Sequence, residues 1–436
     1  MRAPHVFIET FGCQMNEYDT ELVRSILKEK GYRFTDAVET ADVVLLNTCA
    51  IRENAHNKVY GHLGALKPLK KDKGLVIGVL GCMAQNLKKD LLEDDSLIDV
   101  LAGPDSYRSL PELLEKAAAG RKGMAVDLSE YETYADITPD RIEGVTAWIA
   151  VMRGCDNFCT FCVVPYTRGR ERSRDFDGVV REAEALAASG CRQVTLLGQN
   201  VNSYRDGARD FADLLLAVAD VRGIERVRFT SPHPKDFPEK LLEAVAGHPG
   251  ICKHIHLPLQ AGSDRILQLM DRTYTRAEYL ALAGRIRARC PEIVLTTDII
   301  VGFCSETDAE FAETEDLMRH MEYHSAYIFK YSERKNTIAA RKYADDVPDA
   351  VKSERVTKLI EFQRAVSLKK NREMLGKTVD VLVEGEAKRS SDRWMGRTDG
   401  NIVAMFPKTS TTRKPRSLVS VRITDATITT LYGELV

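Results

Sequence analysis

Three cysteines in one short stretch could together bind an iron–sulfur cluster. Cys155, Cys159 and Cys162 form a C-x-x-x-C-x-x-C pattern that follows an apolar run at residues 148–152. Three thiolates from one loop can ligate three irons of a cubic [4Fe-4S] cluster, whereas a full set of protein ligands would be four. The fourth iron would then be open to a substrate or cofactor, which suits a catalytic cluster better than one that only transfers electrons.

A zinc site is the alternative interpretation of these cysteines. Zinc usually takes four nitrogen or sulfur ligands, often from two closely spaced cysteine pairs. The nearest other cysteine, Cys191, lies well down the chain beside an expected strand, so the spacing favours a cluster. We interpret four cysteines as structural or incidental because they lack such spacing: Cys191, Cys252, Cys290 and Cys304.

Three further cysteines each follow an expected strand in the first third of the chain. The expected strands are residues 5–10, 41–46 and 75–80, with a weaker one at 98–101. They alternate with helical segments, which predicts a parallel sheet with helices on its faces and ligands at the carboxyl ends of its strands. Cys13, Cys49 and Cys82 would converge at that edge and bind a second [4Fe-4S] cluster with its own open iron. Buried cysteines that pack as small hydrophobic side chains are the alternative.

From about Thr146 the alternation of strands and helices repeats in longer units. The expected strands are residues 148–152, 193–198, 226–230, 254–259, 294–301 and 325–331. Six strand–helix units of this size predict an open (β/α)6 barrel with its site at the C-terminal ends of the strands.

Polar residues and glycines gather along strands two to five of this expected barrel, mostly at their ends. Amide side chains there could bind an amino acid head group, and glycine lets a ligand approach the backbone closely. The candidate cofactor-binding residues are Gly198, Gln199, Asn200, Ser231, His233, Gln260 and Asp298. A single histidine such as His233 is more often structural than catalytic, and we assign no catalytic residue beyond the clusters.

Four arginines follow the cysteine loop at every second position: Arg168, Arg170, Arg172 and Arg174. A run of charges is usually a solvated face. This run adjoins the expected active site, which favours contact with a phosphate group or a bound cofactor.

The end of the chain differs from the rest in its pattern of charged and apolar residues. A long charged helix is expected over residues 349–375, and short strands are expected at 378–384, 393–398, 401–406, 418–425 and 428–432. Short strands with polar turns predict a small β-barrel. Lys and Arg outnumber Asp and Glu from Lys369 onward, which fits contact with RNA, although a purely structural β domain is the alternative.

The whole chain has the composition of an ordinary globular protein. Its 436 residues suffice for two or three domains, and its formal net charge of −2 gives no basic field that would indicate nucleic acid. The cysteines are not spaced like a secreted disulfide framework, and neither a signal peptide nor a membrane-length apolar run is evident. We therefore expect a cytoplasmic protein.

Four segments together resemble the methylthiotransferases of the radical S-adenosylmethionine (SAM) superfamily. They are residues 11–19 (FGCQMNEYD), 47–53 (NTCAIRE), 81–85 (GCMAQ) and 162–174 (CVVPYTRGRERSR). The resemblance implies an N-terminal methylthiotransferase domain at 1–130, a radical SAM core at 145–370 and a TRAM RNA-binding domain at 371–436. It implies that Cys155, Cys159 and Cys162 hold the cluster that binds SAM, and that Cys13, Cys49 and Cys82 hold an auxiliary [4Fe-4S] cluster.

The activity implied by the resemblance is methylthiolation of C2 of N6-isopentenyladenosine at position 37 of tRNA, next to the anticodon. A radical derived from SAM can remove hydrogen from such an unactivated C–H bond, and sulfur would be delivered at the auxiliary cluster. The base must leave its stack to reach a buried site, and the TRAM domain and the arginine run would hold the anticodon arm. We also expect a reducing electron donor such as flavodoxin, no membrane association and a monomer.

One departure from the family pattern lies after the fifth barrel strand. The family often has Gly-Phe-Pro-Gly-Glu-Thr, whereas residues 302–307 read GFCSET, which questions the loop conformation there. Two alternative functions remain open at this point. One is a sister substrate, either a protein aspartate or another tRNA base. The other is an RNA-binding iron–sulfur sensor, which would leave the polar strand ends without a purpose.

Overall fold

The computed structural model describes residues 3–50, 53–94, 97–141, 144–388, 390–408 and 416–436. Ile51 and Arg52, which belong to one of the four motif segments, lie outside the described residues. The chain forms two compact units: Met1–Ile142, Ala150–Asp175 and Arg334–Arg341 make up the first, and Glu143–Ile149, Phe176–Glu333 and Lys342–Val436 the second. These units group residues by contact and do not test the predicted three-domain division, which stays a prediction.

The first unit contains the predicted parallel sheet, which has six strands rather than four. Its strand order is β2 (Arg33–Phe34), β1 (His5–Phe11), β3 (Val43–Thr48), β4 (Val76–Gly81), β5 (Val100–Ala102) and β6 (Gly123–Ala125). The four predicted strands are present with slightly shifted ends. Strands β2 and β6 were not predicted, because two or three residues are too few to show a hydrophobic period.

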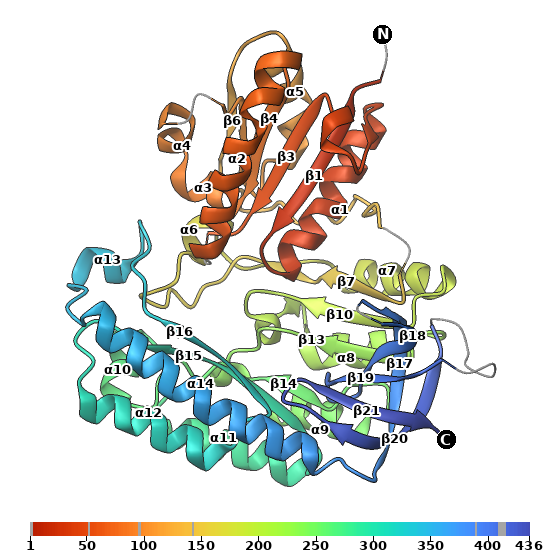
Figure 1. Cartoon of the computed structure of the whole chain (residues 1–436), viewed down its shortest axis with the longest axis vertical. Helices are drawn as coiled ribbons and strands as arrows, with labels where there is room; N and C mark the ends of the chain where they lie inside the picture. Colours follow the sequence, from red (N-terminus) through yellow and green to blue (C-terminus); the bar gives the residue numbers. More distant parts are fainter. Residues whose placement is uncertain (1–2, 51–52, 95–96, 142–143, 389, 409–415) are drawn as a thin grey trace. The chain divides into compact units, whose positions relative to one another are not determined.

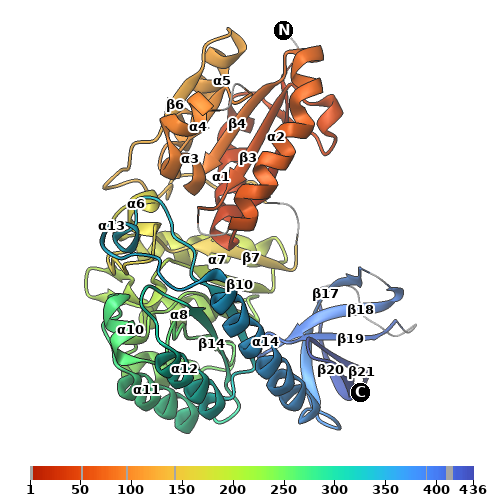
Figure 2. The same ribbon diagram turned by 60° about the vertical axis from the view of Figure 1, so that its left-hand side comes forward.

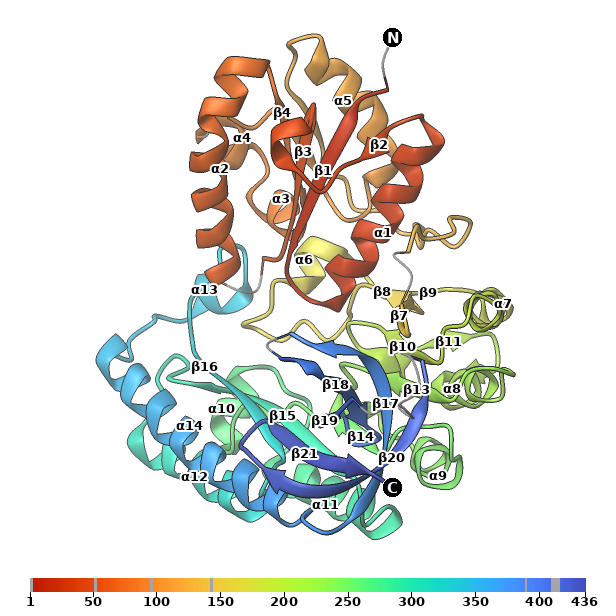
Figure 3. The same ribbon diagram turned by 45° about the vertical axis from the view of Figure 1, so that its right-hand side comes forward.

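Helices cover both faces of this sheet. Figure 3 shows α1 (Gln14–Glu29) and α5 (Leu110–Ala118) on one face and α2 (Glu53–Lys73) on the other. Every residue of β3 and β4 is buried, which explains why their sequences are continuous apolar runs rather than alternating ones. Leu63 and Leu66 of α2 pack against Val44 and Ile77, and full burial of such side chains contributes about 1.5–3 kcal/mol each.

The second unit contains the predicted partial barrel as two three-stranded sheets. One has the order β13 (Arg226–Phe229), β10 (Gln193–Leu197), β7 (Thr146–Ala150), and the other has the order β14 (His254–His256), β15 (Val294–Val301), β16 (Ser325–Lys330). A parallel bridge joins Val227 of β13 to Ile251, which lies three residues before β14. All six predicted strands are present, which confirms the open (β/α)6 arrangement (Figure 1).

The barrel helices begin where the sequence supplies caps. They are α7 (Phe176–Ala188), α8 (Phe211–Ala219), α9 (Glu239–Gly247), α11 (Arg276–Arg289) and α12 (Asp308–Met321). Thr275 and Thr307 open α11 and α12, and each accepts a hydrogen bond from the backbone N–H three residues later. Glu278 and Glu310 complete the two capping boxes, which satisfies donors that a helix start leaves without partners.

The tail of the second unit forms the predicted small β-barrel. Helix α14 (Asp349–Arg372) runs beside β16 and leads into five strands (Figure 2): β17 (Thr378–Ala387), β18 (Ser390–Thr398), β19 (Val403–Pro407), β20 (Leu418–Ala426) and β21 (Thr430–Leu435). They close in the order β17-β18-β19-β21-β20 around Val381, Phe406 and Leu431. Within the described part of the chain, no helix is both long and apolar enough to cross a membrane.

Candidate active site

The register of the first sheet brings three distant cysteines to one edge. Phe11 pairs with Thr48, and Thr48 pairs with Gly81, so β1, β3 and β4 end at the same level. Cys49 and Cys82 directly follow β3 and β4, and Cys13 comes two residues after β1. Cys13 is hydrogen-bonded to Cys49 and lies within electrostatic reach of Cys82. The structure thus places these three thiols together, as the sequence predicted.

Glycines leave the space that this convergence requires. A Cβ atom at Gly12 would lie 2.6 Å from Asn16 Oδ1 and 3.1 Å from Cys49 Cβ. A Cβ atom at Gly81, whose φ is +84°, would lie 2.5 Å from Asn47 Oδ1. Both positions therefore favour glycine, one for space and the other for space and backbone conformation.

Two buried asparagines tie the edge together, and sequence analysis gave them no role. Asn16 Nδ2 donates to Asn47 Oδ1 at 3.2 Å, and Asn47 Nδ2 donates to the carbonyl of Asn16 at 2.9 Å. Asn16 Oδ1 also accepts from the Cys13 thiol at 3.3 Å. Both lie within the segments that resemble the family, but an asparagine by itself does not indicate what it bonds.

The environments of Cys13 and Cys82 shift their pKa values in opposite directions. The hydrogen bond with Cys49, with help from the charge of Arg168, lowers the pKa of Cys13 to about 5 despite burial. Burial raises the pKa of Cys82, and Arg168 only partly offsets that effect. A lowered pKa favours the thiolate, which is the form of a cysteine that ligates iron.

Buried arginines and aspartates lie beside these cysteines. Arg153 and Arg168 each donate to a different oxygen of Asp19 at 2.7 Å. Arg172 donates to Asp105 at 3.0 Å. Burial opposes the charge on Asp19, but Arg153 and Arg168 outweigh it and hold the pKa of this carboxyl below its usual value.

This network corrects the interpretation of the arginine run. Arg168, Arg172 and Arg174 are only 2%, 6% and 4% exposed, so they do not offer their charges to RNA. Arg174 instead donates to the Tyr18 hydroxyl at 3.2 Å. Arg170 is the exposed member of the run and pairs with Asp156 at 3.0 Å. In a regular extended segment every second side chain lies on the same face, so the spacing by itself would put all four arginines on one side. The segment is not a regular strand, because Arg168 ends helix α6 (Val164–Arg168) and Gly169 has a φ of +72°.

The second cysteine group lies on a loop between two short antiparallel strands. Strand β8 (Met152–Arg153) pairs with β9 (Arg172–Ser173), and the Cys155 N–H donates to the Gly169 carbonyl at 3.1 Å. Gly154 has a φ of +79°, and a Cβ there would overlap the Arg170 carbonyl. Burial raises the pKa of Cys155 to about 11.

The arrangement of the thiols bears on which metal group they could hold. Among the described residues, no three His, Cys, Asp or Glu side chains converge as ligands of a single metal ion would. A cubane cluster takes one thiolate at each of several irons, so its ligands surround a volume rather than one ion. At the sheet edge, Arg168 Nη1 is a buried donor without a hydrogen-bond partner among the described residues, and the Arg168 side chain lies within electrostatic reach of Cys82 and Cys13. An anionic sulfur cluster fits that donor and that set of thiols.

A segment from much later in the chain contacts the cysteine loop, and sequence analysis did not find it. In this segment, Arg334–Arg341, the Ala339 N–H donates to the Thr160 carbonyl at 2.8 Å. Asn336, at a φ of +74°, donates to both the carbonyl and the side chain of Asn86, four residues after Cys82. One short segment thus contacts the neighbourhoods of both cysteine groups.

The predicted cofactor-binding residues belong to the second unit, where all but Asp298 follow the ends of strands and Asp298 lies within β15. Gly198 is buried directly after β10, followed by Gln199 and Asn200, whose side chain donates to Asp236 at 3.0 Å. Ser231 and Gln260 both adopt positive φ, at 58° and 71°. Their side chains are therefore set by unusual backbone turns, but no observation places SAM against them, so contact with SAM stays a prediction.

His233 and Asp298 have protein partners that bear on their roles. The His233 backbone N–H donates to Asn202 Oδ1 at 2.8 Å, and its ring accepts from the Lys235 N–H. Burial lowers the pKa of His233 to about 2, so the ring is neutral, and its buried Nε2 has no hydrogen-bond partner in the part of the chain that the structure describes. Asp298 lies 3.1 Å from His256 Nε2, a residue that sequence analysis did not select.

Residues 302–307, which depart from the family pattern, still form a turn that contains a residue with positive φ. Ser305 adopts a φ of +61°, although a serine side chain makes this conformation less favourable than a glycine does. Arg265 donates to the Ser305 carbonyl at 2.7 Å, and the Ser305 N–H donates to Asp346 at 2.6 Å. Local hydrogen bonds therefore hold the turn that the missing glycine would otherwise allow.

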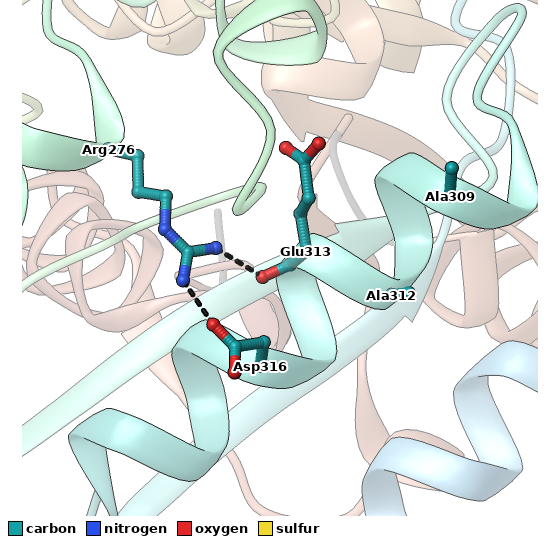
Figure 4. A pocket seen from close by; sticks show the side chains of 5 residues that line it. All are labelled: Arg276, Ala309, Ala312, Glu313 and Asp316. Carbon is teal, nitrogen blue, oxygen red and sulfur yellow. Dashed lines mark hydrogen bonds and ion pairs between the residues drawn. The ribbon is translucent and has the colours of Figure 1, made fainter.

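A separate cavity of about 360 Å³ lies against α11 and α12 (Figure 4). Arg276 crosses it, donating to the Glu313 carbonyl at 2.6 Å and pairing with Asp316, while Ala309 and Ala312 line its wall. None of the predicted site residues is among the described residues that line it, and those residues include no thiol or imidazole. We assign this cavity no part in the chemistry.

Three family descriptions match successive parts of the chain. Residues 5–103 match Uncharacterized protein family UPF0004, residues 149–318 match the Radical SAM superfamily, and residues 372–436 match the TRAM domain. The order is the one that the motifs implied.

Solved structures share the fold at low sequence identity. The radical S-adenosylmethionine methyltransferase TsrM from Kitasatospora setae matches with a TM-score of 0.59 and 15% identity over 78% of this chain and 77% of that one. The cobalamin-dependent S-adenosylmethionine radical enzyme OxsB matches with a TM-score of 0.52 and 12% identity over 84% of this chain and 56% of that one. These likenesses concern the fold alone.

Curated relatives match over almost the whole length. Proteins named tRNA-2-methylthio-N(6)-dimethylallyladenosine synthase are 48% identical in Chloroherpeton thalassium, over 98% of this chain and 95% of the relative, and 46% identical in Porphyromonas gingivalis, over 99% and 95%. A third, from Amoebophilus asiaticus, is 48% identical over 99% of this chain and 92% of the relative. With this identity and coverage, the chain belongs to the tRNA-2-methylthio-N(6)-dimethylallyladenosine synthase family of radical SAM proteins.

Proposed function

We propose that this protein methylthiolates C2 of N6-isopentenyladenosine, also called N(6)-dimethylallyladenosine, at position 37 of tRNA. Family membership supports this reaction, because the curated relatives carry its name. The structural observation that carries the proposal is the convergence of Cys13, Cys49 and Cys82 at one sheet edge. A sulfur-inserting enzyme needs a second site for sulfur, and this edge is suited to provide it.

The protein uses SAM and two [4Fe-4S] clusters, as members of its family do. We propose that Cys155, Cys159 and Cys162 hold the cluster that binds SAM, and that Cys13, Cys49 and Cys82 hold the auxiliary cluster. When bound, these groups supply a carbon radical strong enough to take hydrogen from an aromatic C–H bond, and a site for the sulfur that replaces it.

The chain's own residues bind and orient the reactants. We propose that the amides of Gln199 and Asn200, with the backbone at Gly198, meet the amino acid part of SAM. The buried Nε2 of the neutral His233 is available as a donor, because none of the described residues accepts from it. Ser231, Gln260 and Asp298 complete the proposed contacts.

RNA binding is proposed for the TRAM domain and for Arg170. The closed five-stranded barrel lies within the TRAM match, and its lysine and arginine excess suits phosphates. Arg170 keeps its guanidinium on the surface, with 66% of the side chain exposed. We further propose the domain limits 1–130, 145–370 and 371–436, a monomer in the cytoplasm and a reducing electron donor such as flavodoxin.

Single alanine substitutions at Cys49 and Cys82 test the reaction. Each variant is incubated under anaerobic conditions with isopentenylated tRNA, SAM and a reductant, and the nucleosides are quantified by mass spectrometry. We expect no methylthiolated base from either variant and a normal amount from Cys290→Ala, a buried cysteine at the end of a barrel helix. Normal product from both Cys49→Ala and Cys82→Ala would overturn the proposal.

Iron content and substrate choice provide two further checks. Reconstituted protein should hold about eight irons, falling to about four in the Cys155/Cys159/Cys162 triple alanine variant. A total of about four that falls to zero would leave the sheet-edge cysteines as structural thiols. Parallel incubation with tRNA that lacks the isopentenyl group, and with a protein substrate, distinguishes the sister activities.

A further inference from the structure

Arg168 differs from its neighbours because it faces both a carboxylate and thiols. Its Nη2 donates to Asp19 at 2.7 Å, and the guanidinium is in hydrogen-bonding contact with Cys82 and in electrostatic reach of Cys13. The side chain is almost fully buried, and its Nη1 has no hydrogen-bond partner among the residues that the structure describes. A buried charged donor without a partner is costly unless something else accepts from it.

The charges around Arg168 leave room for a negative group. Three buried arginines, Arg153, Arg168 and Arg172, share two buried aspartates, Asp19 and Asp105. These five side chains together therefore carry more positive than negative charge. Three thiolates around an oxidised cubane carry a net negative charge, which would balance this surplus beside the cysteines.

Arg172 shows what a purely structural arginine looks like in the same network. It is also buried, and it is also paired with an aspartate, Asp105. The charges that act most on Arg172 are those of Asp105, Arg153 and Tyr134. By contrast, Cys82 and Cys13 are among the largest influences on Arg168.

We propose that Arg168 is a positioning residue for the auxiliary cluster: Asp19 fixes its guanidinium, which donates to sulfur at the Cys82 corner and sets the reduction potential of the cluster. This inference rests on the proposed assignment of that cluster to Cys13, Cys49 and Cys82. Positive charge and N–H donors directed at sulfur stabilise the reduced, more negative form, so they raise the potential.

A redox titration followed by electron paramagnetic resonance tests the inference. The full-length Cys155/Cys159/Cys162 triple alanine protein serves as the parent, so that only the auxiliary cluster contributes a signal. Arg168→Met should make the midpoint potential more negative, by at least a tenfold change in the reduction equilibrium, or about 59 mV for one electron. Arg168→Lys, which retains the charge, should restore most of the shift, and Arg168→Gln, which retains only a donor, should restore less.

Arg172→Met is the matched control. It removes a similarly buried, aspartate-paired arginine of the same segment that does not contact the described thiols, so it should lower the free energy of unfolding and shift the midpoint potential much less than Arg168→Met does. An Arg168→Met protein that binds no iron, beside a normally loaded Arg172→Met control, would also support a positioning role. An unchanged potential in loaded Arg168→Met protein would overturn the inference and leave the proposed function intact. A parent that binds no cluster would overturn both.

Discussion

Two sets of buried arginines in this protein are neutralised in different ways. The carboxylate set consists of Arg153, Arg168 and Arg172, which pair with Asp19 and Asp105 in the first unit. The carbonyl set consists of Arg226 and Arg228 on β13 of the second unit, which donate to backbone carbonyls of the tail barrel. Both sets are nearly excluded from water, and they differ in whether carboxylates or carbonyls accept from them.

Arg168 and Arg228 show opposite electrostatic consequences, whereas Arg172 of the carboxylate set resembles Arg228 in that burial lowers its pKa. Burial disfavours the charge on Arg168, but Asp19 and the nearby thiols outweigh it and raise the pKa of this guanidinium above its ordinary value. Burial lowers the pKa of Arg228, and Cys252 and Asp399 offset this only in part. Carbonyl dipoles satisfy the donors of Arg228 without supplying a full negative charge.

This difference shows what each set is suited to do. The carboxylate set fixes side chains in a charged environment next to the cysteines, where a charged cluster is proposed. Within the carbonyl set, Arg228 donates to the carbonyls of Thr398 and Asp399 at 2.7 and 2.8 Å. Bonds to backbone atoms depend little on side-chain identity in the barrel, so they anchor the barrel to β13 whatever sequence its turn carries.

The largest expected effect comes from removing the shared carboxylate. Asp19→Asn removes the carboxylate of Arg168 and leaves Arg153 with only the more distant Asp105, at 3.9 Å. Breaking a buried pair typically costs about 3–5 kcal/mol. Chemical denaturation should show this loss in the free energy of unfolding. Asp140→Asn is the control, because Asp140 pairs with Arg24 and Lys28 near the surface and should cost no more than about 1 kcal/mol. Equal losses would remove the distinction between buried and surface pairs.

A smaller effect is expected from the carbonyl set. Arg228→Met removes donors to two carbonyls and to Gln193, but it also removes a charge that was costly to bury, so we expect a loss of about 2 kcal/mol. The same denaturation assay measures it, with the exposed Arg222→Met as the control. A loss as large as that of Asp19→Asn would mean that carbonyls stabilise a buried arginine as strongly as carboxylates do.

Lowering the pH should reduce the free energy of unfolding through histidines of the second unit in one pH range, and through Asp19 of the carboxylate set in a lower one. Burial lowers the pKa of His324 to about 4 and that of His254, beside Arg228, well below its usual value. Below the unfolded histidine pKa of about 6.5, the unfolded chain gains protons that the folded chain refuses, so stability falls as pH falls towards 4. We expect a loss of about 2 kcal/mol from each of these histidines between pH 7 and 5.

The lowered pKa of Asp19 affects stability at a lower pH than the histidines do. Its contribution is complete above the unfolded aspartate pKa of about 3.9 and is lost only as pH falls below that value. Urea denaturation across pH 7 to 5 should therefore give the same slope for Asp19→Asn as for the parent, and a flatter slope for a His254→Gln/His324→Gln variant. An unchanged slope in the histidine variant would refute this assignment.

The smallest stability effect is expected at the exposed arginine. Arg170→Ala removes a surface ion pair with Asp156, so stability should change by less than about 1 kcal/mol. If Arg170 contacts a phosphate, tRNA binding should weaken and its dependence on salt should fall by about one unit of slope. The control is Arg121→Ala, at an exposed position of the same unit. Equal affinities for the two variants would remove Arg170 from the RNA surface.

Much of the fold follows from local sequence patterns. The strands that carry Cys49 and Cys82 are continuous apolar runs, and such runs between helices indicate a parallel sheet buried on both faces. Parallel strands share one carboxyl edge, so the convergence of the cysteines could be predicted without coordinates. The capping boxes at Thr275 and Thr307 are similarly local signals, because three residues separate the partners.

Other features depend on partners that are distant in sequence. Asn336 meets Asn86 across 250 residues, and no pattern around either residue indicates the contact. The strands β2 and β6 are too short to show a period and exist because a neighbouring strand offers hydrogen bonds.

The sequence by itself determined which cysteines are candidates to hold the proposed clusters, because cysteine spacing and strand position are local properties. Only the tertiary structure decided the roles of the arginines. Arg168 and Arg170 look alike in sequence, but Arg168 meets Asp19, 149 residues away, and is buried, whereas Arg170 points to solvent. Burial of a charge requires a partner that the fold brings from elsewhere in the chain, so no local pattern could distinguish the two.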